Sequence, residues 1–324
     1  MSLRSWTRGW LSALVCLVTL SASWPASAQG RETAGVITEI KIGRGRAELK
    51  VAGGSEWRPA GPRLALRAGD EVRVTADAVV VVLLSGGRGS VKVDDAKSPF
   101  IVGAVPTTDR KLQKARTLVE GSLTFLSASA KEPPKAVLST RAEAKPPVIM
   151  APRNGPVLPD SLIFEWLRTQ FSRYTVRVAD AAGVVLEPKG VIGSRFEYPA
   201  DAPRLRAGTR YSFQVLSGSH PPQETQFEVL DASRAAAIRR DLAALDEALG
   251  PGVSPSSLTA LRAGYLASEG LIHDARLLVV RSLATDPDEP ILHMLLGSLY
   301  LKSGLAEQAA QAYDEAQFLL TQGN

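Results

Sequence analysis

Residues 66–84 read LRAGDEVRVTADAVVVVLL, and they decide how the first third of the chain folds. Within this stretch, Val72 and Val74 alternate with charged and hydroxyl-bearing residues, which is the period of a half-buried β-strand. The run 78–84 is apolar throughout, contains many β-branched residues and is too short for a helix. It therefore predicts a central strand that is covered on both faces.

Glycine-rich turns separate this stretch from its neighbours. Gly69 tolerates a positive φ, and the carboxylate of Asp70 can accept hydrogen bonds from nearby backbone amides. Residues 47–51 alternate like a strand, and the loop 85–90 contains three glycines but lacks the Gly-Lys-Ser/Thr ending of a nucleotide-binding loop. We interpret that loop as a hairpin turn. Short strands between such turns predict a compact antiparallel barrel or sandwich.

These residues resemble the FecR-type periplasmic domain over about 34–103. The resemblance rests on an opening Gly-Val strand, a Trp, a Leu-x-x-Gly-Asp-x-Val turn, a strand flanked by small polar residues and a closing glycine turn, here Gly35-Val36, Trp57, Leu66–Arg73, Ala76–Ala78 and Leu83–Gly87. Membership implies a β domain and a relay from an outer-membrane transducer to a cytoplasmic sigma factor. The relay needs a cytoplasmic segment before a membrane span, and this chain offers only a few residues there.

The N-terminal 28 residues are typical of a signal peptide. Arg4 and Arg8 precede an apolar run at 11–20, and the small residues Ala26-Ser27-Ala28 precede Gln29, so we expect cleavage between Ala28 and Gln29. Cleavage removes the single cysteine and leaves no apolar run long enough to span a bilayer. The mature protein is then periplasmic or secreted. The alternative is an uncleaved anchor, which a membrane-anchored FecR-type signalling regulator requires.

The composition excludes several classes of function. The chain has 324 residues, of which 45% are hydrophobic and 22% charged, as expected of several globular domains. One Cys and three His exclude cysteine-ligated zinc, iron–sulfur clusters and a thiol nucleophile in the mature chain. The sequence contains no catalytic motif such as Gly-x-Ser-x-Gly or His-Glu-x-x-His. We therefore expect no enzymatic activity, no metal and no cofactor.

Charge is spread unevenly. Residues 29–145 carry a net charge of +7 and residues 231–324 a net charge of −5. Few aromatic residues accompany the basic ones, so the pattern does not predict a nucleic-acid partner. We interpret the basic excess at 29–145 as a solvated surface. The alternative is that this region binds an anionic cell-wall polymer, either peptidoglycan or a polysaccharide.

A helix and a linker follow the first β domain. Apolar residues recur every three or four positions over about 109–128, which predicts a helix, and we expect it to pack on the first domain. Residues 129–146 are rich in Lys, Ala, Glu and Pro and predict an extended linker. We thus expect domains at 29–128 and 147–230.

Residues 147–230 predict a β-sandwich. Alternating strands at 164–166, 174–178 and 211–215 are separated by glycine turns, and about seven strands fit. A Trp in an early strand, a Tyr-x-Val-x-Val strand and Leu205-x-x-Gly208-x-x-Tyr211 resemble an immunoglobulin-like or fibronectin-type domain. We interpret Trp166 as a core residue rather than a sugar-stacking platform.

Residues 231–324 predict an all-helical region. Residues 232–249 form one helix, and a 34-residue offset then pairs Gly270 with Gly304 and Ala275 with Ala309. This spacing resembles two tetratricopeptide repeats, in which the glycines turn helical hairpins. Neither repeat has the early Trp of the family, since Thr259 and His293 stand there. We interpret His293 as structural and His273-Asp274 as the start of a helix.

Together these features predict a multidomain β-plus-α protein: a FecR-like antiparallel β domain, an immunoglobulin-like sandwich and tetratricopeptide-like helices. The leading hypothesis is a non-enzymatic periplasmic sensor or scaffold that binds an envelope protein through its helical repeats. The sequence identifies neither that partner nor the residues that bind it.

Overall fold

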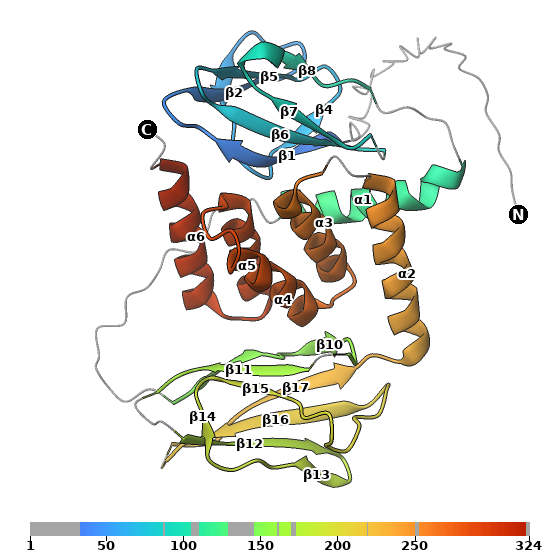
Figure 1. Cartoon of the computed structure of the whole chain (residues 1–324), viewed down its shortest axis with the longest axis vertical. Helices are drawn as coiled ribbons and strands as arrows, with labels where there is room; N and C mark the ends of the chain where they lie inside the picture. Colours follow the sequence, from blue (N-terminus) through green and yellow to red (C-terminus); the bar gives the residue numbers. More distant parts are fainter. Residues whose placement is uncertain are drawn as a thin grey trace, which may run out of the picture. The chain divides into compact units, whose positions relative to one another are not determined.

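The computed structural model describes residues 33–86, 88–104, 110–128, 146–160, 162–169, 173–218, 220–249 and 253–321 (Figure 1). The expected cleavage site at Ala28 and Gln29 and residues 129–145 of the expected linker lie outside these ranges. All described residues belong to one compact unit, Thr33–Asn324. None of the described helices is long and apolar enough to cross a membrane.

The first β domain consists of two four-stranded antiparallel sheets (Figure 1). One sheet has the order β4 (Ala65–Arg67), β1 (Thr33–Lys41), β6 (Val79–Leu84), β7 (Ser90–Val93). The other has the order β3 (Trp57–Pro59), β2 (Arg46–Lys50), β5 (Glu71–Thr75), β8 (Phe100–Ile101), and a short 3-10 helix, Asp95–Lys97, precedes β8. The expected strands at 47–51, 72–74 and 78–84 are confirmed as β2, β5 and β6, and the 85–90 loop is the β6–β7 hairpin.

The predicted Gly69-Asp70 turn is confirmed in detail. Gly69 has φ +87°, a conformation that side-chain-bearing residues rarely adopt. The Asp70 carboxylate is buried and accepts hydrogen bonds from the backbone N–H of Arg67 (2.8 Å) and of Ala52 (2.9 Å). The side chain thereby ties the turn before β5 to the loop that follows β2.

Strand β6 is covered on both faces, as its continuous apolar run predicts. Val80, Val82 and Leu84 lie in the core between the two sheets. Leu83 points the other way and, together with Val36 of β1, belongs to the core formed by the helices. The outer face of the β1–β6 sheet is therefore a packing surface for the helices.

The second β domain is an immunoglobulin-like sandwich. Its three-stranded sheet has the order β15 (Arg195–Glu197), β11 (Ile163–Leu167), β9 (Val148–Ala151). Its larger sheet has the order β10 (Gly155–Val157), β17 (Gln223–Val229), β16 (Arg210–Leu216), β12 (Arg173–Asp180), β13 (Gly183–Leu186), and β14 (Val191–Ile192) also pairs with β12 (Figure 1). The described residues form nine strands rather than the expected seven or so, because β10 and β14 are too short to show a clear alternation.

Aromatic side chains fill the sandwich core. The Trp166 side chain is 2% exposed and meets Tyr174 edge-on, so its interpretation as a core residue is confirmed. The Tyr211 hydroxyl accepts a hydrogen bond from the backbone N–H of Arg206 (2.7 Å), five residues upstream. A tyrosine at the start of the penultimate strand that bonds back in this way is the tyrosine corner of immunoglobulin-like sandwiches.

The last part of the chain forms five helices within the described residues. They are α2 (Ala232–Leu249), α3 (Pro255–Ser268), α4 (Ile272–Leu283), α5 (Pro290–Lys302) and α6 (Ala306–Thr321). Helices α3–α4 and α5–α6 are two hairpins, and the predicted turn glycines have φ +82° at Gly270 and +74° at Gly304. At Gly297, an added Cβ would lie 2.9 Å from the Tyr313 ring, so α5 and α6 pack too closely for a larger residue.

Helix α1 (Arg110–Ala128) matches the helix expected at 109–128. The expectation that it packs on the first domain is incomplete, because its buried residues Val119, Leu123 and Leu126 join the core of α2 and α3 while the helix also contacts β1. At Gly264 of α3, an added Cβ would lie 3.0 Å from the Ser122 carbonyl oxygen of α1. This close approach makes α1 part of the helical layer.

Candidate functional site

Arg63 fastens the first β domain to the helices. Its side chain is 2% exposed, and its backbone has φ +66°, a strained conformation for arginine. The guanidinium donates from Nε to the Leu126 carbonyl of α1 (2.6 Å) and from Nη1 to the Met294 carbonyl of α5 (3.1 Å) and the Ser298 hydroxyl (2.9 Å). Burial lowers the pKa of Arg63 to about 10, so it stays protonated at neutral pH. Carbonyls near the end of α1 supply the negative potential that it needs.

A second polar contact joins β1 to the start of α3. The Ser257 hydroxyl donates to the Glu39 carboxylate (2.7 Å) and lies 2.8 Å from the Thr38 hydroxyl, and Ser254 also donates to Glu39. Ser254 caps α3 by accepting from the Ser257 N–H (3.1 Å). A carboxylate at a helix N-terminus is favoured by the helix dipole. The first domain thus meets the helices through apolar packing and through buried hydrogen bonds.

The sandwich meets the same helices through polar groups and through Leu158 and Leu230, which pack in the helical core. Arg276 of α4 is 5% exposed and pairs with Glu165 of β11, and burial lowers the pKa of Arg276. The Leu158 backbone N–H donates to the Asp274 carboxylate of α4 (3.1 Å). Two further contacts involve exposed or partly buried arginines: Arg239 of α2 pairs with Asp160, and Arg153 donates to the Ser303 carbonyl (2.8 Å).

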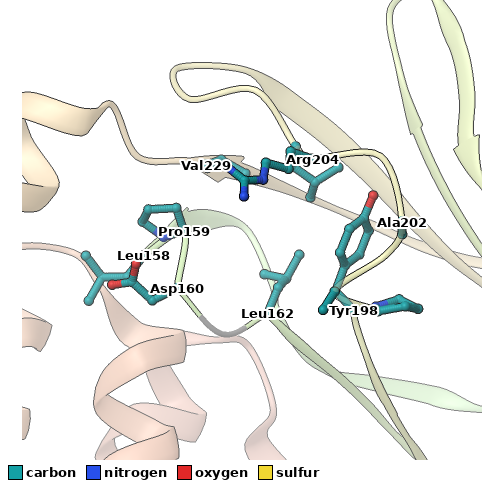
Figure 2. A pocket seen from close by; sticks show the side chains of 11 residues that line it. Leu158, Pro159, Asp160, Leu162, Tyr198, Ala202, Arg204 and Val229 are labelled. Atoms are coloured by element: carbon teal, nitrogen blue, oxygen red, sulfur yellow. The ribbon is translucent and has the colours of Figure 1, made fainter.

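A hollow of about 510 Å³ opens beside this junction (Figure 2). Figure 2 shows Tyr198 and Leu162 on one side, and Leu158, Pro159 and Asp160 on the other, with Arg204 at the edge between them. Pro199, Ala200, Ala202, Leu205 and Val229 complete the wall. The Tyr198 hydroxyl donates to the Pro203 carbonyl (2.5 Å), which fixes the ring against the loop.

A smaller hollow of about 180 Å³ continues from the first. The two share Leu158 and Asp160, and the second is lined on the helical side by Leu242, Leu266, Asp274, Leu277, Leu278 and Arg281. We call the two hollows together the junction groove. Its walls come from the sandwich at one end and from α2, α3 and α4 at the other, so it exists only where these parts meet.

Two consecutive residues of α4 near the groove, His273 and Asp274, are buried titratable groups. Burial raises the pKa of Asp274 to about 7, opposed by the Leu158 N–H bond and assisted by the charge of Asp160. Burial lowers the pKa of His273 to about 4, and neither of its ring nitrogens has a hydrogen-bond partner among the described residues. His273 is therefore neutral at pH 7. The helix start that the sequence predicts at His273-Asp274 is confirmed, because α4 begins at Ile272.

A third shifted group lies at the first-domain junction. Burial raises the pKa of Glu289 to about 7, and the charges of Glu39 and Asp286 raise it further. Glu289 lines a hollow of about 360 Å³ with Lys41 of β1 and Asp286. No group of three His, Cys, Asp or Glu side chains within the described ranges is arranged to hold a metal ion.

The sequence predicts no catalytic, cofactor-binding or metal-binding residue. His293 Nε2 lies 2.7 Å from the Pro287 carbonyl, which agrees with a structural role. Sequence reasoning missed Arg63, Arg276 and the junction groove. Arg276 could have been noticed, because it is a charged residue at a position of α4 where the helical pattern expects an apolar one. Arg63 could not, because it lies in a loop and the helices that bury it are far along the chain.

Comparisons with known proteins add little. No family model matches the chain, and no curated protein matches it. Among solved structures, it is similar to a two-domain fibronectin type-III segment of chicken tenascin, with 12% identity, coverage of 61% of this chain and 96% of that chain, and a TM-score of 0.18. The assignment of the immunoglobulin-like fold therefore rests on the strand order and the tyrosine corner described above.

Proposed function

We propose that this chain is a non-enzymatic scaffold or sensor of the bacterial cell envelope that works through protein–protein contacts. In this proposal, residues 1–28 are an export signal, residues 34–103 form a FecR-type domain, and α3–α6 form two tetratricopeptide-like repeats. The 34-residue offset and the two helical hairpins support the repeat assignment.

One observation carries the proposal: a single helical layer contacts both β domains. Helices α3 and α5 pack on β1, and α4 packs on β10. The faces of α3 and α5 that meet β1 and α1 are already occupied by this chain. A partner would therefore engage the repeats where α2, α3 and α4 meet the sandwich, at the junction groove. A helical layer that orients two β domains is the arrangement expected of a scaffold.

The contacts of the first domain occupy some of the basic side chains that a cell-wall polymer would need. Among its described basic residues, Lys50 pairs with Glu71 (2.8 Å) and Arg73 pairs with Glu48 (2.5 Å), while Arg63 is buried. These three cations are not available to an anionic polymer. The burial of Arg63 removes one cation from the accessible surface of this region, whereas the two ion pairs each take one cation and one anion and leave its net charge unchanged.

Site-specific photocrosslinking in intact cells tests this function. A benzoylphenylalanine placed at Ala202 or Arg281, on the two ends of the junction groove, should give a discrete protein adduct in the envelope fraction. The same probe at Arg173, an exposed residue at the far end of the sandwich sheet, is the matched control.

Three results would contradict the proposal. Equal adducts from all three positions would show that the groove is not the partner site. Adducts released by muramidase instead of protease would favour peptidoglycan binding. A chain found intact in the cytosol would remove the envelope role.

A further inference from the structure

The junction groove is lined mostly by aliphatic side chains and has, at each end, a cation without an ion-pair partner among the described residues. Arg204 lies at the sandwich end and Arg281 at the helical end, and both side chains are exposed. Within the described part of the chain, neither guanidinium forms a hydrogen bond or an ion pair. The Asp160 carboxylate between them forms an ion pair with Arg239 (Nε to Oδ2, 2.9 Å).

The remaining acid of the groove, Asp274, offsets at most one of these cations, so Arg204, Arg281 and Arg239 outnumber Asp160 and Asp274 even when Asp274 is ionised. Asp274 is buried under the helical hollow, and burial raises its pKa to about 7. The groove therefore presents a net positive charge around apolar walls. A ligand that matches it carries apolar groups between negative ones.

The dimensions favour an extended ligand. The larger hollow, about 510 Å³, falls within the range of small-ligand pockets, whereas the smaller one, about 180 Å³, has room for only a side chain or two. Pro159 and Pro199 have no backbone N–H, and most other lining side chains are aliphatic. Such walls suit aliphatic side chains better than the hydroxyl-rich surface of a polysaccharide.

We propose that the junction groove binds an extended peptide segment in which aliphatic residues are flanked by carboxylates. Arg204 pairs with one carboxylate and Arg281 with the other, and the aliphatic side chains enter the hollow between Tyr198 and Leu158. This inference rests on the proposed function and names the chemistry of the partner surface.

Calorimetric titration of the full chain with the blocked heptapeptide SELPLES tests the proposal. The expected result is saturable binding at low salt that weakens about fivefold for each of the variants Arg204→Gln and Arg281→Gln, because each removes one exposed charge pair. The peptide SQLPLQS, which differs only in charge, should bind at least tenfold more weakly. The variant Arg173→Gln is the matched control and should bind like the unmodified chain.

A second variant blocks the hollow itself. Ala202→Phe adds a ring to the wall of the larger hollow on the side of Tyr198 and should abolish binding of both peptides, with the thermal unfolding transition unchanged. Equal affinity for the Glu and Gln peptides, or an equal loss in Arg173→Gln, would overturn the proposal. Retention of heparin through Arg204 and Arg281 without peptide binding would instead assign the groove to an anionic polysaccharide.

The outcomes separate the two proposals. Crosslinking at Ala202 and Arg281 without heptapeptide binding would leave the scaffold function standing and reject the acidic-apolar partner. Heptapeptide binding without any protein adduct in cells would support the peptide-binding groove and reject the scaffold function.

Discussion

The two β domains are held by the same helices in different ways. The first domain contributes Val36 and Leu83 to the helical core and buries Arg63 between α1 and α5. The sandwich contributes Leu230 and Leu158 to the same core and adds ion pairs and hydrogen bonds to α2 and α4, of which the Arg239–Asp160 pair is solvent-exposed. Charge pairs respond to pH and salt more strongly than apolar burial does, although the first-domain junction also contains Glu289, whose pKa burial raises to about 7. The first domain and the helices should therefore unfold together, whereas the sandwich junction includes charged contacts that salt and pH can weaken.

The largest effect is expected from a charge in the apolar junction. Leu83→Asp buries an unpaired carboxylate where Leu83 is fully buried, and should cost about 4 kcal/mol of unfolding free energy or prevent folding. Urea unfolding followed by circular dichroism measures this cost. Val184→Asp, on a β13 residue that is 56% exposed, should change stability by less than about 0.5 kcal/mol. If Leu83→Asp folds with unchanged stability, apolar packing of the first domain on the helices does not hold that domain in place.

The next effect comes from Arg63. Arg63→Ala leaves the Leu126 and Met294 carbonyls and the Ser298 hydroxyl without this donor, and should cost about 3 kcal/mol. The exposed neighbour Arg58 is the control, and Arg58→Ala should be within about 0.5 kcal/mol of the unmodified chain. Equal stability of the two variants would show that Arg63 does not fasten the domain.

Stability should also depend on pH at the sandwich junction. The folded pKa of Asp274, about 7, lies above its ordinary 3.8, so its contribution is complete below pH 4 and is lost as pH rises through 7. His273, with a folded pKa of about 4, acts oppositely: its contribution is present above pH 6.5 and is lost as pH falls through 4.

The variant Asp274→Asn isolates the carboxyl. Between pH 5 and pH 8, the unfolding free energy of this variant should fall by about 2 kcal/mol less than that of the unmodified chain, as measured by urea unfolding at both pH values. Asp314→Asn, on an exposed residue of α6, should leave the slope unchanged. An unchanged slope in Asp274→Asn would show that this carboxyl is ionised in the folded protein.

The smallest effect is expected at the exposed pair of the junction. Both side chains of the Asp160–Arg239 pair are about half exposed, so Asp160→Asn should cost less than about 1 kcal/mol, and the cost should vanish in 0.5 M salt. Thermal unfolding at two salt concentrations checks this. A salt-independent cost above 2 kcal/mol would mean that the sandwich junction is as firmly held as the first.

Much of the local structure follows from the sequence, because local patterns determine it. The alternation of β5, the Gly69-Asp70 turn and the turn glycine Gly270 were all predictable from neighbouring residues. Arg63 was not, because its carbonyl partners lie far along the chain in α1 and α5. The junction groove likewise depends on how the sandwich meets α4, which no local pattern encodes.

Native-state hydrogen exchange on the variant Leu83→Ala tests whether the first domain and the helices unfold as one unit. The amides of β1, β6, α3 and α5 are expected to lose protection together and by the same free energy, while those of β12 and β16 in the sandwich keep theirs. Loss of protection confined to β1 and β6, with α3 and α5 unchanged, would contradict this expectation.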